Sequence, residues 1–84
     1  MRICVTQEDI KRGKRHSATR CPIARAATAA TRTDCGVGMN TLYIYQKNVE
    51  TIDILLPVNA RNFRHDFDNG LCVEPIEFEV DFEL

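Results

Sequence analysis

The sequence contains no apolar run that is long enough to cross a membrane. A transmembrane helix needs about 20 apolar residues in succession, and no segment of the 84-residue chain approaches that length. The first residues, Met1 to Val5, also lack the long apolar region of a secretory signal peptide. These absences predict a cytoplasmic protein with no membrane partner.

The chain also lacks the paired ligands of a zinc site, which usually come as two pairs with a few residues between the members of each pair. All four cysteines are far apart in the sequence: Cys4, Cys21, Cys35 and Cys72. Neither histidine belongs to a paired motif, and the reducing cytosol favours free thiols over disulfides. We therefore predict no metal and no disulfide framework, and we expect Cys4, Cys35 and Cys72 to be small buried residues of strands.

Other catalytic arrangements are incomplete as well. Gly36 and Gly38 lack the third glycine and the following helix of a phosphate-binding loop. Asp66 and Asp68 are two residues apart, so on a helix their carboxylates point in different directions and cannot share a cation. Cys21 lies beside an arginine at a predicted helix start, where a thiol pKa can fall, but burial as a helix-entry residue is the favoured interpretation. We expect a non-enzymatic protein without a cofactor.

The first half of the chain has the patterns of a strand followed by two helices. Residues 1–5 alternate apolar and polar side chains, as in a half-buried strand. Thr6 can cap a short helix that Gly13 ends. Pro22 suits the first turn of an alanine-rich helix that continues to about residue 32, and residues 14–20 between the two helices should form an exposed basic loop.

The second half predicts a hairpin, a third helix and a final strand. Alternating apolar residues from Cys35 to Tyr45 and from Val49 to Leu55 are typical of an antiparallel hairpin. Pro57 can open a helix that Asn69-Gly70 closes. A chain of this length builds one hydrophobic core. Residues 1–84 are thus predicted to form a single α+β domain, with an antiparallel or mixed sheet of about four strands and two or three helices mainly on one face.

The last nine residues have the most regular pattern in the chain. Apolar residues alternate strictly with acidic ones, so a strand over 76–84 would pack one face and expose the other. Four carboxylates would then project about 7 Å apart: Glu77, Glu79, Asp81 and Glu83. This spacing is similar to that of successive phosphates on a nucleic-acid strand.

The charges are divided unequally between the two halves. Residues 1–42 carry eight basic and three acidic residues, whereas residues 43–84 carry three basic and nine acidic residues. The cations concentrate between positions 11 and 32: Lys11, Arg12, Lys14, Arg15, Arg20, Arg25 and Arg32. Such a division predicts charged partners, although basic and acidic parts of one domain can also face each other and neutralise.

Four fragments carry a resemblance to a known group of proteins. They are Glu8-Asp9-Ile10 with Gly13, the run Cys21-Pro22-Ile23-Ala24-Arg25-Ala26, the run Phe63-Arg64-His65-Asp66-Phe67-Asp68-Asn69-Gly70, and Val73-Glu74-Pro75-Ile76-Glu77-Phe78. In this order they resemble short uncharacterised proteins encoded by tailed phages and prophages. The resemblance implies a phage-encoded protein in a bacterial host cell. It supplies no activity and no site residues.

The first functional hypothesis is a small inhibitor or modulator of a host protein. Small phage proteins frequently bind and block a host protein, such as a defence nuclease or a CRISPR complex. An anti-defence or anti-CRISPR protein of this kind would use the acidic strand, joined by Asp66 and Asp68, to occupy a site that normally grips nucleic acid. Tyr43 and Tyr45 would be anchors if their face is exposed. The competing interpretation of the acidic face is an edge strand whose charges prevent aggregation.

Two alternatives remain open at the level of sequence. The first is a nucleic-acid-binding accessory protein that uses the basic segment 11–32. No recognition-helix pattern and no base-stacking aromatic cluster accompanies that segment, so the first hypothesis is favoured. The second alternative is a structural or assembly protein of the virion, which would self-associate, for example as a homodimer.

Overall fold

A computed structural model describes residues 1–82, which form an α+β fold of five strands and three helices. In chain order the elements are β1 (Arg2–Val5), α1 (Gln7–Arg12), α2 (Pro22–Thr31), β2 (Cys35–Val37), β3 (Thr41–Ile44), β4 (Ile52–Leu55), α3 (Val58–Asp68) and β5 (Ile76–Glu79). None of the helices in this part of the chain is long and apolar enough to cross a membrane.

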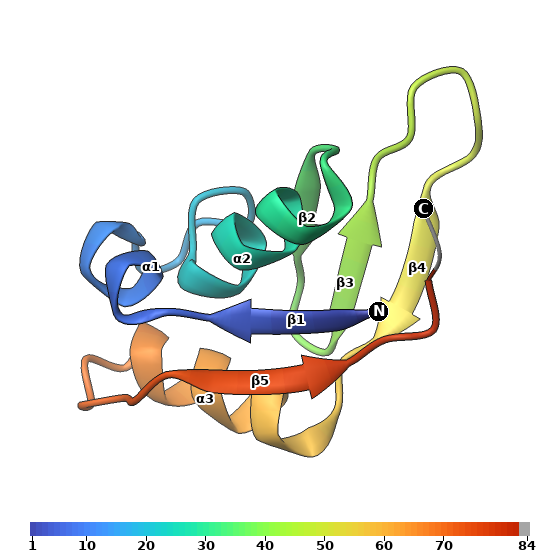
Figure 1. The fold of residues 1–84 in the computed structure, drawn as a ribbon. Helices are drawn as coiled ribbons and strands as arrows, with labels where there is room; N and C mark the ends of the chain where they lie inside the picture. Colours follow the sequence, from blue (N-terminus) through green and yellow to red (C-terminus); the bar gives the residue numbers. More distant parts are fainter. Residues whose placement is uncertain (83–84) are drawn as a thin grey trace.

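The strands form two antiparallel sheets where one sheet of about four strands was expected. β1 pairs with β5, and β3 lies between β2 and β4 in the second sheet (Figure 1). The difference arises at Met39-Asn40, where the backbone of Gly38 bonds that of Thr41 and turns the chain back. The apolar run from Cys35 to Tyr45 therefore contains two short strands that pair with each other. The strands near the two ends of the chain, β1 and β5, pair in a separate sheet.

The helices begin and end where the local sequence signals predict. Thr6 and Asp9 form a reciprocal capping box at α1, and Gly13 ends that helix. Pro22 occupies the first turn of α2, and Pro57 precedes α3, which ends before Asn69. These boundaries depend on nearest neighbours in the chain, which explains why the sequence predicts them well.

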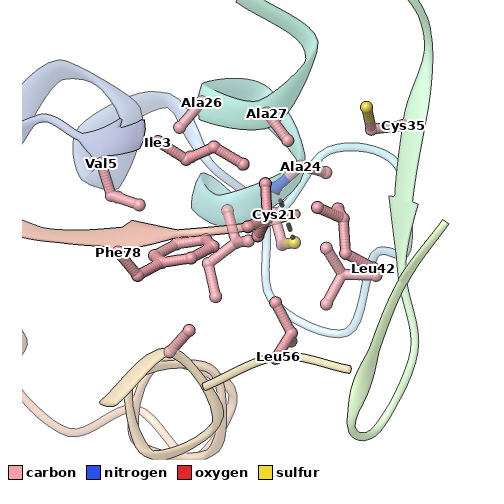
Figure 2. Packing of buried hydrophobic residues seen from close by; sticks show 14 of the residues in the cluster. Ile3, Val5, Cys21, Ala24, Ala26, Ala27, Cys35, Leu42, Leu56 and Phe78 are labelled. Atoms are coloured by element: carbon pink, nitrogen blue, oxygen red, sulfur yellow. Dashed lines mark hydrogen bonds between the residues drawn. The ribbon is translucent and has the colours of Figure 1, made fainter. Parts of the chain in front are cut away.

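The two sheets and two of the helices share one hydrophobic core (Figure 2). Ile3 of β1, Leu42 of β3 and Phe78 of β5 are buried in it. α2 contributes Ala24 and Ala27, which are both fully buried, and their small side chains let the helix lie close to β1 and β2. α2 packs against β1 and β2, while α3 packs against β5. The outer faces of both sheets carry mainly polar and aromatic side chains, together with the exposed Leu55 of β4.

The C-terminal strand is shorter than the predicted span of 76–84. β5 ends at Glu79. Backbone hydrogen bonds between Val80 and Met1 form the last pair between the two chain segments. Phe82 N–H then donates to the Val80 carbonyl, and the chain bends there. The alternation of burial continues beyond the strand, because Val80 and Phe82 are buried and Asp81 is exposed. Glu83 and Leu84 lie outside the described residues.

Candidate interaction surfaces

An open depression of about 520 Å³ lies between α1, the loop 14–20 and α2. Four cationic residues from these three segments line it: Arg12, Lys14, Arg20 and Arg25. The hydroxyl residues Thr19 and Thr28 are also part of the lining, and Asp9 is the acidic residue there. The fold thus brings four of the seven cations of the basic segment to one concave surface.

Backbone hydrogen bonds hold the loop in place at this depression. Lys14 N–H donates to the Arg20 carbonyl over 2.9 Å, and Cys21 N–H donates to the Ser17 carbonyl over 3.2 Å. Arg20 N–H also donates to Ser17 Oγ at 3.1 Å. The loop predicted to be exposed is therefore closed by its own hydrogen bonds, which fix the backbone at Lys14 and Arg20.

The acidic residue in the depression is already engaged. Asp9 Oδ2 accepts from the Thr6 backbone N–H and hydroxyl as part of the α1 cap. Its other oxygen lies 3.4 Å from Arg25 Nε. Arg12 pairs with Glu8 on the exposed side of α1. Within residues 1–82, Lys14 and Arg20 form no salt bridge, so their charges are available to an anion.

The other three predicted cations do not line the depression. Lys11 is exposed on α1, and Arg32 is exposed at the end of α2, where it adopts a left-handed conformation with φ of 59°. Arg15 extends towards the turn after α3, because a Cβ placed on Gly70 would lie 3.4 Å from the Arg15 guanidinium carbon. The basic segment is therefore divided between one concave site and its surroundings.

Tyr43 and Tyr45 form a flat aromatic surface on the outer face of the β2–β3–β4 sheet. Their rings are nearly parallel, with an interplanar angle of 11° and 6.5 Å between ring centroids. Each ring comes close to a glycine of β2, where a larger residue would not fit. A Cβ atom added to Gly36 would lie 2.6 Å from the Tyr45 hydroxyl, and a Cβ atom added to Gly38 would lie 3.1 Å from Tyr43 Cε2. Gly36 and Gly38 therefore leave room for the hydroxyl ends of the two rings against β2.

The acidic residues of β5 are exposed, but an arginine lies among them. Glu77 and Glu79 share the outer face of the β1–β5 sheet with Arg2 and Cys4. Arg2 Nε donates to Glu79 Oε1 over 3.1 Å, and the N-terminal ammonium lies 3.8 Å from the other oxygen. The row of anions predicted from the alternation is therefore interrupted, with Glu77 and Asp81 exposed on either side of a paired Glu79.

Asp68 does not belong to an exposed acidic surface, contrary to the prediction. Its side chain is only 13% exposed. One oxygen accepts from His16 N–H at 3.0 Å and the other from Arg64 Nη1 at 3.2 Å, so it ties the basic loop to α3. Asp66 is 45% exposed and lies beside His65. Of these two acids, only Asp66 presents its carboxylate to solvent.

Cys21 is a buried helix cap. Its sulfur accepts a hydrogen bond from Ala24 N–H at 3.4 Å (Figure 2). Burial raises the pKa of the Cys21 thiol, with a smaller opposing effect from backbone hydrogen bonds, so the thiol stays protonated near neutral pH. This agrees with the favoured interpretation of Cys21 as a helix-entry residue.

Two other cysteines differ from the prediction. Cys4 and Cys72 are exposed, whereas Cys35 is buried as expected. Cys4 stands between Ile3 and Val5, whose side chains enter the core, so the alternation that predicted β1 also places Cys4 on its outer face. All four are free thiols.

We expect the thiols to react with a disulfide reagent in two groups. Cys4 and Cys72 should be modified quickly in the native protein, because both are exposed. Cys21 and Cys35 should react only on unfolding, since burial raises both pKa values. Mass spectrometry of a timed reaction identifies the modified residues. Early modification of Cys21 would contradict its assignment as an inert cap.

Comparison with protein-family models, curated proteins and solved structures finds no match for this chain. Its function must therefore be inferred from its own residues. Within residues 1–82, no group of three or more potential ligands among His, Cys, Asp and Glu is placed to hold a metal ion. The two charged surfaces and the tyrosine pair are then the features from which a function can be argued.

Proposed function

We propose that this protein is a non-enzymatic binding protein and that its basic depression between α1 and α2 binds the phosphate backbone of a nucleic acid. The observation that carries the proposal is the convergence of Arg12, Lys14, Arg20 and Arg25 on one concave surface. This proposal reverses the preference drawn from the sequence, because folding gathers the cations while Arg2 interrupts the acidic row.

The chemistry of the depression suits phosphate better than a carboxylate-bearing protein surface. Lysine and arginine contact phosphate oxygens through charge-assisted hydrogen bonds, and hydroxyl residues such as Thr19 and Thr28 are common additional donors. The neutralised phosphates release counterions, so binding must weaken as salt is added. The loop backbone at Lys14 and Arg20 is already held by hydrogen bonds, so binding has to order only their side chains.

The test is equilibrium binding of labelled DNA and RNA to the full chain at several salt concentrations. We expect saturable binding, with a slope of about −1.5 when the logarithm of the affinity is plotted against the logarithm of the salt concentration. This slope corresponds to about two neutralised phosphates, at Lys14 and Arg20, because Arg12 and Arg25 are already paired with Glu8 and Asp9. Lys47 lies in the loop between β3 and β4 and does not line the depression, so Lys47→Glu controls for net charge. An absence of binding at about 50 mM salt refutes the proposal.

A second candidate is docking of a host protein on the acidic surface, as expected of a phage-encoded inhibitor of a defence system. It is supported by Glu77 and Asp81, which are exposed and form no salt bridge within the described residues. Under this candidate, replacing both by lysine should abolish capture of the partner from host lysate. Unchanged capture would remove this surface.

A further inference from the structure

Tyr43 and Tyr45 place two parallel rings at the outer face of the β2–β3–β4 sheet, with the hydroxyl end of each ring close to a glycine of β2. Gly36 and Gly38 lie beneath the rings, and Tyr45 is 43% exposed. The rings are parallel and 6.5 Å apart, which is close to the separation of about 7 Å between alternate residues of a strand. The two rings therefore form a parallel aromatic stack, to which further planar groups such as bases could be added.

This aromatic surface adjoins the basic depression through the edge of β2. Val37 lies between the two glycines, and its N–H donates to the Ala18 carbonyl over 2.8 Å. Thr19 and Arg20, the next residues after Ala18, line the depression. The segment 18–20 therefore connects the edge of β2 to the depression.

We infer that the nucleic acid bound by this protein is single-stranded, with two of its bases stacked on Tyr43 and Tyr45. The inference rests on the proposed function, because the cations of the depression hold the phosphates. In a duplex the bases are stacked on one another and their faces are closed to side chains. A single strand can turn its bases onto aromatic rings while its backbone follows a row of cations.

Asp53 disfavours a phosphate over β4, and the exposed Asp34, whose carbonyl accepts from Tyr45 N–H, disfavours one close to Tyr45. Asp53 is the cross-strand neighbour of Tyr43 on β4, is exposed, and would repel phosphates on that side. The cations lie beyond β2, on the opposite side of the tyrosines. The sugar-phosphate backbone should therefore lie towards β2 and the loop 14–20, with the bases directed over β3.

Intrinsic fluorescence tests the inference on the unlabelled full chain. The protein contains two tyrosines and no tryptophan, so tyrosine emission reports Tyr43 and Tyr45 alone. The probes are an oligothymidylate of about 12 nucleotides, a length within the usual range for one small domain, and a duplex of equal length. We expect the single strand to quench the emission and to bind more tightly than the duplex.

Paired substitutions separate stacking from structural support. Tyr43→Leu with Tyr45→Leu keeps an apolar cover over the glycines but removes both aromatic faces, and should weaken single-strand binding at least about tenfold. Tyr43→Phe with Tyr45→Phe keeps the faces and should bind within about twofold of the parent. Labelled oligonucleotide anisotropy gives the affinities, and circular dichroism confirms that both variants fold.

The outcomes distinguish this inference from the proposed function. Equal affinity for duplex and single strand, or a leucine variant that binds like the parent, overturns the inference while salt-dependent binding upholds the depression. No binding of either probe overturns both. A phenylalanine variant as weak as the leucine variant shows that the hydroxyls, and not the ring faces, make the contact, and it also overturns base stacking.

Discussion

Reversing the charges of Lys14 and Arg20 together should lower the affinity for nucleic acid about a hundredfold at low salt. Both residues line the depression, and neither forms a salt bridge within residues 1–82. Lys14→Glu with Arg20→Glu removes two phosphate contacts and adds two repulsive charges. The salt dependence should fall at the same time, because each lost phosphate contact reduces the slope by about one.

Stability provides the control for this double variant. Both side chains are exposed, and exposed substitutions usually change the free energy of unfolding by no more than about 0.5 kcal/mol. The thermal midpoint should therefore stay close to that of the parent. Lys47→Glu, at an exposed site outside the depression, should retain most of the binding. If Lys47→Glu were as damaging as the double reversal, binding would depend on net charge and not on the depression.

Ile3→Ala should destabilise the fold by about 2 to 5 kcal/mol, the usual range for truncation of a buried isoleucine. Ile3 is fully buried, pairs across the sheet with Phe78, and belongs to the strand on which α2 packs. The cavity would open where α2 and both chain ends meet. Because small domains have only about 5 to 15 kcal/mol of stability, this one change should remove a large share of it.

Urea denaturation measures the effect, and the neighbouring residue supplies the control. Cys4 is in the same strand but faces solvent, so Cys4→Ala should change the free energy of unfolding by about 0.5 kcal/mol or less. Similar losses for Ile3→Ala and Cys4→Ala would mean that β1 does not have the burial pattern described for it.

Local signals explain which parts of the fold could be predicted from the sequence. The capping box of Thr6 and Asp9 and the prolines at positions 22 and 57 act on their own neighbours, so the three helices were predicted nearly to their ends. The α+β class follows from the same patterns. The inward residues of β1 and β5 were also predicted, because alternation fixes the buried face wherever a strand forms.

Features that depend on distant residues could not be predicted in the same way. The division into two sheets depends on β1 pairing with β5 across the whole chain. The burial of Asp68 depends on His16 N–H, 52 positions earlier. Gly36 with Gly38 and Tyr43 with Tyr45 have matching spacings. That match indicates that the two tyrosines can lie over the two glycines, but it can be recognised only when the register of β2 and β3 is known.

Chemical-shift mapping of the labelled protein during titration with oligothymidylate tests the central claim most directly. Binding at the basic depression predicts large amide shifts over residues 9–20 and 25–29, which include its lining, and base stacking predicts further shifts at Tyr43 and Tyr45. Shifts concentrated on Glu77 to Asp81, or spread evenly over the surface, would contradict a nucleic-acid site between α1 and α2.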